Sequence, residues 1–311
     1  MCREMQPLSE RTKAIIGDHK NVEIEAILKQ MQVLGTRSPV RSLIRSKDGI
    51  SLYRVKSEGK SFVLKVFEKQ EDTREIENYQ ILSALGIPIL PLLGATWNAI
   101  LLPDVEADEE YRLGTENDLS NPQAARAIAR WYREFHAKGR IFLADKKVSM
   151  YDETDVISLT NLELIAEKSD TKNWEVWKVI REHFDMIRCR IDALPRTLTY
   201  NDFYWTNLAV SKDLEKAFMF DYNLLGKGTA YSDIRNVTSS LSHEAAEAFL
   251  EEYGNDITVE EVKADAFTAP LITLFFAYGR ETFPAWAKAS LEELKNGDVL
   301  RCLKEWLCLE Q

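Results

Sequence analysis

The chain has 311 residues, of which 45% are hydrophobic, and carries a formal net charge of −10 at pH 7. This length and apolar content allow one or two folded domains with a substantial buried core. The acidic balance disfavours nucleic acid and anionic membrane surfaces as binding partners.

Two β-rich runs lie near the amino terminus, at residues 50–55 and 61–67, and they predict a hairpin. Lys65 is the only charged residue inside the second run. A lone ammonium facing the core is costly, so Lys65 either points to solvent or pairs with an acid and a phosphate. The preceding loop, residues 44–50, offers Ser46 and a single glycine, Gly49, as candidate phosphate contacts.

Residues 73–85 have the apolar spacing of a helix. Glu75 shares a face with Tyr79 and Leu82, whereas Glu77 lies about 200° around the helix. We therefore expect Glu75 to face the packed side, where it can pair with Lys65.

An uncharged stretch follows, from residue 80 to residue 103. A transmembrane helix is excluded because turn-forming residues interrupt the stretch at Gly86, Pro88, Pro91, Gly94 and Asn98. Two buried strands are expected instead, at residues 89–93 and 99–102.

The next segment, residues 104–118, is strongly acidic. Such a run binds cationic substrates in some proteins, and Asp104 and Glu106 are the candidates here. The alternative is a solvated surface loop.

The remainder of the chain is mainly helical in pattern. A helix should begin at Asn121–Pro122, with Asn as the cap and Pro at the first helical position, and further helices are expected around residues 161–168, 174–191 and from 259 onward. His136 is expected to be structural. The four cysteines form no metal-binding pattern and the chain shows no secretory signal, which favours a cytoplasmic setting.

The most informative motif joins Asp202 and Asn207, followed by Asp221 after an apolar run at residues 217–220. Phosphoryl transfer needs a carboxylate that accepts the proton of the attacking hydroxyl, and oxygen ligands that hold a metal against the nucleotide phosphates. An isolated Asp-x-x-x-x-Asn would more simply be a turn with a cap. The position of Asp221, at the end of a predicted strand shortly after Asn207, favours the phosphoryl-transfer interpretation.

At these residues the chain resembles the aminoglycoside phosphotransferase and choline kinase-like branch of the protein-kinase fold, whose catalytic loop reads His-Gly-Asp-x-x-x-x-Asn. Here Tyr200 and Asn201 replace His-Gly. A Tyr hydroxyl can take over a hydrogen bond of the missing imidazole, and Asn tolerates positive φ. The resemblance implies that Asp202 is the catalytic base, that Asn207 and Asp221 bind Mg²⁺, and that Tyr200 and Asp233 support the loop.

The same resemblance implies an α+β, two-lobed protein kinase-like fold. Residues 1–103 would form a nucleotide-binding lobe with a small antiparallel sheet, and residues 104–311 a helical lobe with the catalytic loop. Lys65, braced by Glu75, would hold the α- and β-phosphates of ATP or GTP. Tyr204 and Trp205 are candidates for the acceptor pocket.

The expected function is therefore a small-molecule kinase that phosphorylates a hydroxyl group. The acidic stretch favours a cationic, aminoglycoside-like acceptor. A metabolite acceptor of the choline, sugar, homoserine or fructosamine type stays open, and so does a nucleotide-binding pseudokinase that acts as an interaction module. The oligomeric state is not defined by the sequence.

Overall fold

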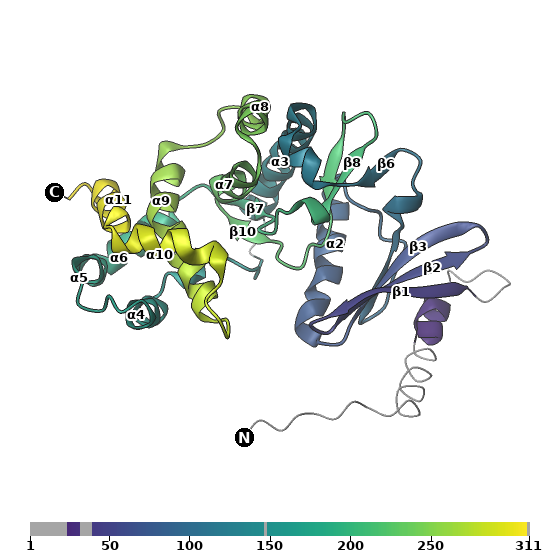
Figure 1. Ribbon diagram of the computed structural model, residues 1–311, viewed down its shortest axis with the longest axis horizontal. Coiled ribbons are helices and arrows are strands. Elements are labelled where there is room, and N and C mark those ends of the chain that lie inside the picture. Colours follow the sequence, from purple (N-terminus) through teal and green to yellow (C-terminus); the bar gives the residue numbers. More distant parts are fainter. Residues whose placement is uncertain (1–23, 32–38, 146–147, 310–311) are drawn as a thin grey trace, which may run out of the picture. The chain divides into compact units, whose positions relative to one another are not determined.

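The computed structural model describes residues 24–31, 39–145 and 148–309 of the chain (Figure 1). The chain divides into two compact units, Met1–Arg112 and Leu113–Gln311. The sequence analysis placed the boundary between the two lobes after residue 103, which is the last residue of a strand, Ala99–Pro103, and lies within the first unit.

The first unit is built on a five-stranded antiparallel sheet of order β1-β2-β3-β5-β4. Its elements are β1 Val40–Lys47, β2 Ile50–Ser57, β3 Lys60–Phe67, η1 Gln70–Thr73, α2 Arg74–Ala84, β4 Gly94–Ala95, β5 Ala99–Pro103 and η2 Val105–Ala107, after a helical segment at residues 24–30. The predicted hairpin is confirmed, because β2 and β3 pair in register around Glu58 and Gly59, which both have positive φ.

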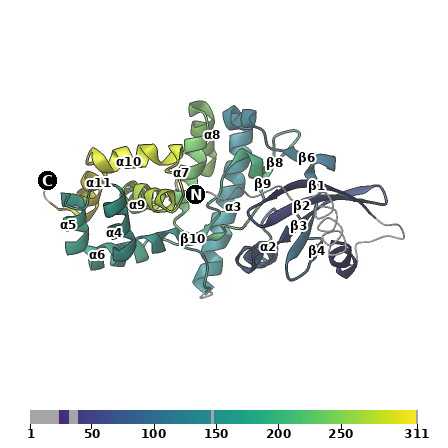
Figure 2. The same ribbon diagram turned by 60° about the horizontal axis from the view of Figure 1, so that its bottom comes forward.

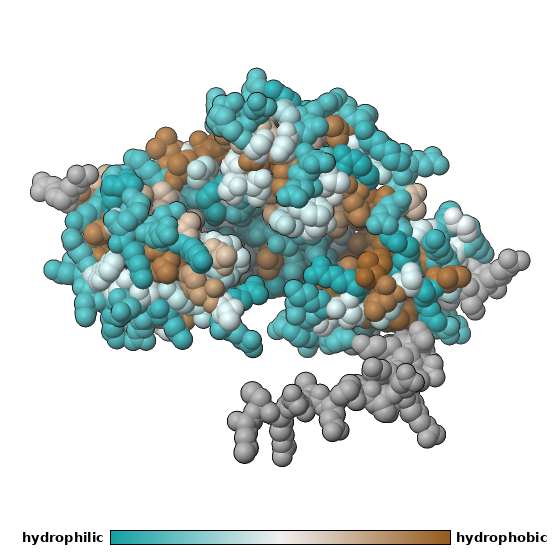
Figure 3. Space-filling model, in the orientation of Figure 1, coloured by the Kyte–Doolittle hydropathy of each residue, from teal (hydrophilic) through white to brown (hydrophobic). Residues whose placement is uncertain are grey.

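Alternation along β3 divides its side chains between two faces of the sheet. Leu64 packs in a cluster with Ile24, Ile27 and Leu28 of the amino-terminal helical segment. Lys65 points to the other side, where α2 lies (Figure 1). At the edge of the sheet, β1 is exposed, and hydrophobic residues appear on the surface over these strands (Figure 3).

One predicted strand is wrong. Residues 89–93 form no strand, and only Leu93 donates a backbone hydrogen bond to the neighbouring β5, at Leu101. Pro88 and Pro91 have no N–H to donate to a ladder, which explains why pairing begins only at β4. The second predicted strand is confirmed as β5.

The second unit is mainly helical. Its elements are η3 Glu116–Ser120, α3 Pro122–Asp145, η4 Glu153–Val156, α4 Leu159–Lys168, α5 Glu175–Glu182, α6 Phe184–Asp192, β7 Thr197–Thr199, η5 Trp205–Asn207, β8 Leu208–Ser211, β9 Ala217–Met219, β10 Gly226–Gly228, α7 Ala230–Ser240, α8 His243–Tyr253, α9 Val259–Tyr278, η6 Ala285–Ala287, α10 Lys288–Lys295 and α11 Asp298–Leu307. The strand β6 Tyr111–Leu113 contains the unit boundary.

Helix α3 begins as predicted. Asn121 Oδ1 accepts hydrogen bonds from the backbone N–H groups of Gln123 and Ala124, at 2.9 and 3.2 Å, so the cap satisfies donors that the first turn leaves open. The predicted helix at 174–191 is instead two helices, α5 and α6, which meet at His183.

Two groups of helices frame the short strands of this unit. Helix α3 packs against α8 and β7, while α9 packs against α4, α7, α10 and α11 (Figure 2). Gly139 lets α3 approach β7 closely, since a Cβ there would lie 2.6 Å from the backbone nitrogen of Leu198. The segment that follows β7 is thereby fixed against the helical core.

Candidate active site

Lys65 and Glu75 form a buried ion pair in the first unit. Lys65 Nζ lies 2.6 Å from Glu75 Oε2, and the two side chains are only 6% and 1% exposed. The helical phase explains the choice of glutamate, because Glu75, Tyr79 and Leu82 are all buried on α2 while Glu77 is exposed. A charged pair held this deep is costly to desolvate, which makes it a candidate for a functional role.

The other two candidate phosphate contacts, Ser46 and Gly49, lie at the first hairpin. The chain turns between β1 and β2 at Asp48 and Gly49, whose φ angles of +54° and +90° suit a two-residue hairpin turn. Ser46 Oγ lies 2.9 Å from Ser51 Oγ across the two strands. Gly49 also anchors the turn, because its carbonyl accepts from the N–H of Glu68 at 2.8 Å.

Asp233 holds the backbone of the candidate catalytic loop, residues 200–207, in the second unit. Its carboxylate, on α7, accepts from the N–H groups of Tyr200 and Asn201 at 2.8 and 2.9 Å. His136 Nε2 lies 3.1 Å from the same carboxylate, and His136 Nδ1 lies 3.0 Å from the Tyr253 hydroxyl. The buried charge thus has several polar contacts, and the start of the loop is tied to α3, α7 and α8.

Asp202 and Asn207 are joined by side-chain hydrogen bonds, and the segment that contains Asp221 lies beside them. Asn207 Nδ2 donates to Asp202 Oδ2 at 3.0 Å and to the Asp202 carbonyl at 3.2 Å. The backbone carbonyl of Asn207 accepts from the N–H of Phe220 at 3.0 Å, which places Asp221, the next residue, beside the loop. The predicted base is therefore bonded to one predicted metal ligand, Asn207, and the backbone next to the other, Asp221, is bonded to Asn207 as well.

The donor set of these residues fits Mg²⁺. Because Nδ2 of Asn207 is engaged with Asp202, Oδ1 is the atom of this side chain that can face a cation, and Asp221 adds a carboxylate. Within the described residues, no three His, Cys, Asp or Glu side chains gather as a closed metal cage. Mg²⁺ is usually bound by only one or two protein side chains, and phosphate oxygens and water molecules complete its coordination sphere.

Tyr200 and Asn201 have the properties that the sequence suggested for them. The Tyr200 hydroxyl donates to the carbonyl of Phe220 at 2.5 Å, and Asn201 has a φ of +64°. Burial raises the pKa of the Tyr200 phenol well above its usual range, and neighbouring Tyr132, Asp202 and Asp221 add to that effect. Tyr200 is therefore a neutral donor at ordinary pH.

Asp104 and Glu106, the candidate acceptor ligands from the sequence, both form ion pairs with Arg54 of the first unit. Asp104 accepts from Arg54 Nε at 2.7 Å and from the Ser61 hydroxyl at 2.6 Å, and Glu106 also pairs with Arg54. Among the aromatic candidates, Tyr204 is half exposed and its ring lies 5.7 Å from that of Trp205.

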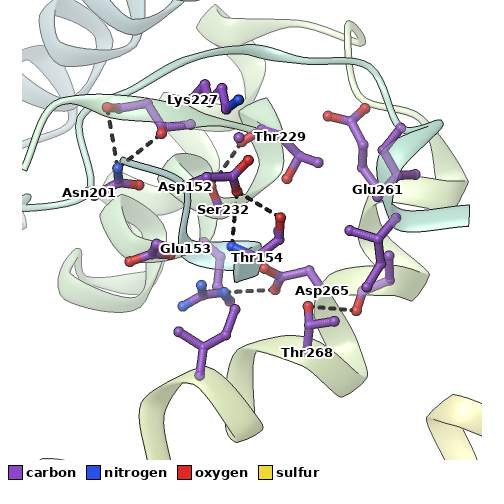
Figure 4. Close-up of a pocket in the computed structure, with 17 residues that line it drawn as sticks. Asp152, Glu153, Thr154, Asn201, Lys227, Thr229, Ser232, Glu261, Asp265 and Thr268 are labelled. Atoms are coloured by element: carbon purple, nitrogen blue, oxygen red, sulfur yellow. Dashed lines mark hydrogen bonds and ion pairs between the residues drawn. The ribbon is translucent and has the colours of Figure 1, made fainter. Parts of the chain in front are cut away.

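A pocket that the sequence did not reveal lies directly beside the catalytic loop (Figure 4). It is small, with a volume of about 30 Å³, and is lined by Thr199 at the end of β7, by Asn201 and by residues of η4, α6, β10, α7 and α9. Its ionisable groups are four acids and two bases, namely Asp152, Glu153, Glu261, Asp265, Lys227 and Arg235. These positions are far apart in sequence, so no spacing in the chain could have indicated the pocket.

Most of these acids have structural partners. Asp152 accepts from Arg196, Asp265 accepts from Arg235 Nε at 2.7 Å, and Glu261 closes a capping box with Thr258. Glu153 differs, because burial raises its pKa to about 7 in spite of the opposing attraction of the Arg235 guanidinium. A carboxyl group of this kind gains from a bound cation.

Residues 45–267 match the model of the phosphotransferase enzyme family, and the chain belongs to this family. It is accordingly a small-molecule kinase that transfers phosphate to an alcohol group. At the level of sequence, no curated protein matches the chain. No helix that the structure describes is long and apolar enough to cross a membrane.

Solved structures share the fold at low sequence identity. A choline kinase from Streptococcus pneumoniae is 14% identical, with a TM-score of 0.59 over 94% of this chain and 99% of that one. A macrolide 2'-phosphotransferase from Brachybacterium faecium is 15% identical, with a TM-score of 0.54 over 86% and 97% of the two chains. A spectinomycin phosphotransferase, solved with ADP and spectinomycin, is 12% identical, with a TM-score of 0.55 over 88% and 93%. The predicted two-lobed, kinase-like α+β fold is confirmed.

Proposed function

We propose that this protein transfers the γ-phosphate of a nucleoside triphosphate, in the presence of Mg²⁺, to a hydroxyl group of a small cationic acceptor. The observation that carries the proposal is the pair of bonds made by Asn207. Its side-chain Nδ2 donates to Asp202 Oδ2, and its backbone carbonyl accepts from the N–H of Phe220, next to Asp221. A candidate base and two candidate metal ligands are thereby held beside one another, as phosphoryl transfer requires.

In this proposal Asp202 is the catalytic base. Its carboxylate, oriented by Asn207, accepts the proton of the acceptor hydroxyl while that oxygen attacks the γ-phosphorus. The bond between the γ-phosphorus and the β,γ-bridging oxygen breaks, and the nucleoside diphosphate leaves. Asn207 Oδ1 and Asp221 would hold Mg²⁺, which neutralises phosphate charge when it is bound.

Lys65 would bind the α- and β-phosphates of the nucleotide. Its pairing with Glu75 fixes the ammonium in a single position on the buried side of β3. A preorganised cation stabilises the developing charge on the leaving nucleotide more effectively than a mobile one. Ser46 and Gly49, at the first hairpin, are proposed to add contacts to the phosphates.

The pocket beside Asn201 supports a cationic acceptor. Thr199 and Asn201 line it, and Asn201 directly precedes Asp202, so a small group of an acceptor bound there has the catalytic loop as one wall. Glu153 is the candidate for binding an ammonium group, because a nearby positive charge would stabilise its ionised form. Amino alcohols and aminoglycosides carry both the required amine and the required hydroxyl.

Kinetics with a panel of acceptors tests this proposal. Product formation should depend on Mg²⁺ and ATP or GTP, and amino alcohols or aminoglycosides should be turned over in preference to neutral sugars and to homoserine. Glu153→Gln should raise the KM of the cationic acceptor about 10-fold, a typical value for the loss of one ionic hydrogen bond, and leave the KM of the nucleotide unchanged.

Asp155→Asn is the matched control, since Asp155 lies on the same short helix but is exposed and does not line the pocket. An equal effect of both substitutions would refute the role of Glu153. Turnover of neutral acceptors alone would refute the cationic class. Nucleotide binding without turnover of any acceptor would favour an interaction module over an enzyme.

A further inference from the structure

Two side-chain hydrogen bonds reach the segment that contains Asp221 from the two residues that precede Asp202. The Tyr200 hydroxyl donates to the carbonyl of Phe220, immediately before Asp221, at 2.5 Å. Asn201 Nδ2 donates to the carbonyl of Leu224, three residues after Asp221, at 3.0 Å. The candidate metal ligand is thus bracketed on both sides by the lead-in to the candidate base.

We propose that Tyr200 and Asn201 are positioning residues, which together fix Asp221 relative to Asp202 and so set the geometry of the metal against the base. This inference rests on the proposed function, because it assumes that Asp202 is the base and that Asp221 binds Mg²⁺. It goes further in assigning to this dipeptide a role in the reaction itself.

The backbone of the dipeptide is a rigid anchor. Both N–H groups, of Tyr200 and Asn201, donate to the buried carboxylate of Asp233, at 2.8 and 2.9 Å. The Tyr200 ring is fully buried and packs edge-on against Trp131 and Tyr222. A side chain held in this way has little freedom, so its hydroxyl defines the position of the Phe220 carbonyl closely.

Asn201 adds a bond that glycine could not make. Its φ of +64° is a conformation that glycine adopts without strain, so the backbone alone does not require a side chain here. The amide nitrogen also donates to Thr199 Oγ1 at 2.9 Å, so that one NH₂ group connects β7 to the segment after Asp221. The two bonds drawn from the Asn201 amide in Figure 4 both go to Thr199, to its hydroxyl and to its carbonyl.

The position of Asp221 depends on these contacts in particular. Asp221 itself has a φ of +65°, which is uncommon for a residue other than glycine and persists only where the surroundings determine it. The bonds to the carbonyls of Phe220 and Leu224, with the bond from Phe220 N–H to Asn207, constrain the backbone on both sides of this residue.

Tyr200→Phe and Asn201→Gly test the inference: the first removes the bond to Phe220, the second removes the amide bonds to Leu224 and Thr199, and both keep the local backbone acceptable. We expect kcat to fall about 10-fold in each variant, since small displacements of reacting groups and loss of groups that orient metal ligands have effects of this size. In Asn201→Asp, kcat should fall further, because a carboxylate oxygen replaces the donor and faces the carbonyl oxygens of Thr199 and Leu224.

A readout without turnover accompanies the kinetics. The Mg²⁺ concentration that gives half of the rise in Tm produced by MgATP should increase about 10-fold in both variants. Ser169→Ala is the control, because the buried Ser169 hydroxyl also donates to a backbone carbonyl, that of Ile165 at 2.7 Å, but lies at the end of α4 and outside the candidate site. It should lower Tm while leaving the Mg²⁺ dependence and kcat close to those of the native protein.

Unchanged kcat and unchanged Mg²⁺ dependence in both bracket variants, together with inactive Asp202→Ala and Asp221→Ala proteins, would overturn the inference while the proposed function stands. Losses of Tm equal to that of Ser169→Ala, with no kinetic effect, would show that Tyr200 and Asn201 are merely structural. Full turnover in Asp202→Ala would instead overturn the proposed function.

Discussion

Lys65 Nζ and Glu75 Oε2 lie 2.6 Å apart in a part of the first unit that water barely reaches. The ammonium also lies 5.6 Å from the centre of the Phe67 ring, close enough for a cation–π contact. A pair buried so completely is poor at stabilising a fold compared with apolar residues of similar size. Its presence is better explained by a task for the ammonium group.

Lys65→Ala should therefore have two effects. Nucleotide affinity should fall at least 10-fold, and the free energy of unfolding should fall by about 3–5 kcal/mol, because Glu75 keeps a buried charge without the ammonium that neutralises it. Isothermal titration with ATP and urea unfolding measure the two quantities. Lys60→Ala, at an exposed position of the same strand, is the control, and equal affinities of the two variants would disprove the phosphate role.

Asp233→Ala should unfold more readily than the native protein by about 3–5 kcal/mol. The substitution leaves two backbone N–H groups and His136 without their buried acceptor, and each such loss costs about 1–3 kcal/mol. Urea unfolding followed by tryptophan fluorescence gives the value. A change below about 1 kcal/mol would mean that Asp233 does not hold the catalytic loop.

Glu153→Gln should change stability in a pH-dependent way. The pKa of Glu153 is raised from an ordinary value of 4.5 to about 7 in the folded protein, so ionising it costs free energy that appears as pH rises from 4.5 to beyond 7. The variant should match the native protein at pH 4 and exceed its stability by about 1–3 kcal/mol at pH 9. Equal differences at both pH values would contradict the assignment.

Asp104→Asn tests whether the acidic stretch after β5 serves the fold or the acceptor. Although burial opposes ionisation, the Ser61 hydroxyl and the Arg54 guanidinium hold the pKa of Asp104 below its usual range. The ion pair should therefore contribute stability above about pH 4 that is lost as pH falls further. We expect a loss of about 1–2 kcal/mol at pH 7, with the KM of the acceptor unchanged. An increase in that KM would return Asp104 to the acceptor site.

Local patterns predicted the parts of the site that local physics determines. The helical phase of α2 selected Glu75 over Glu77, because one face of a short helix must pack. The properties of a phenol and an amide were enough to suggest how Tyr200 and Asn201 replace His-Gly. The apolar run at residues 89–93 led us to predict a strand that does not form. Pro88 and Pro91 have no backbone N–H to donate to a neighbouring strand.

The pocket beside Asn201 lay beyond sequence reasoning. Its walls come from four distant segments of the second unit, and the raised pKa of Glu153 results from their packing. Several acids of the stretch at residues 104–118 have local structural roles. Asp108 and Asp118, for example, accept backbone hydrogen bonds within their own turns. Charge along the chain suggested Asp104 and Glu106 as ligands of a cationic acceptor, whereas we propose Glu153, which the packing buries beside Asn201.

If Asp202 is the base of a phosphoryl transfer, Asp202→Ala should lose turnover while it still binds MgATP, and measuring both quantities on one preparation tests this role. We predict that kcat falls by about 10²–10⁴-fold, the usual contribution of a general base, while the Kd of MgATP stays within a few-fold of the native value. Asp221→Ala should show the opposite weighting, with Mg²⁺-dependent binding weakened. Near-native turnover in Asp202→Ala would contradict the account.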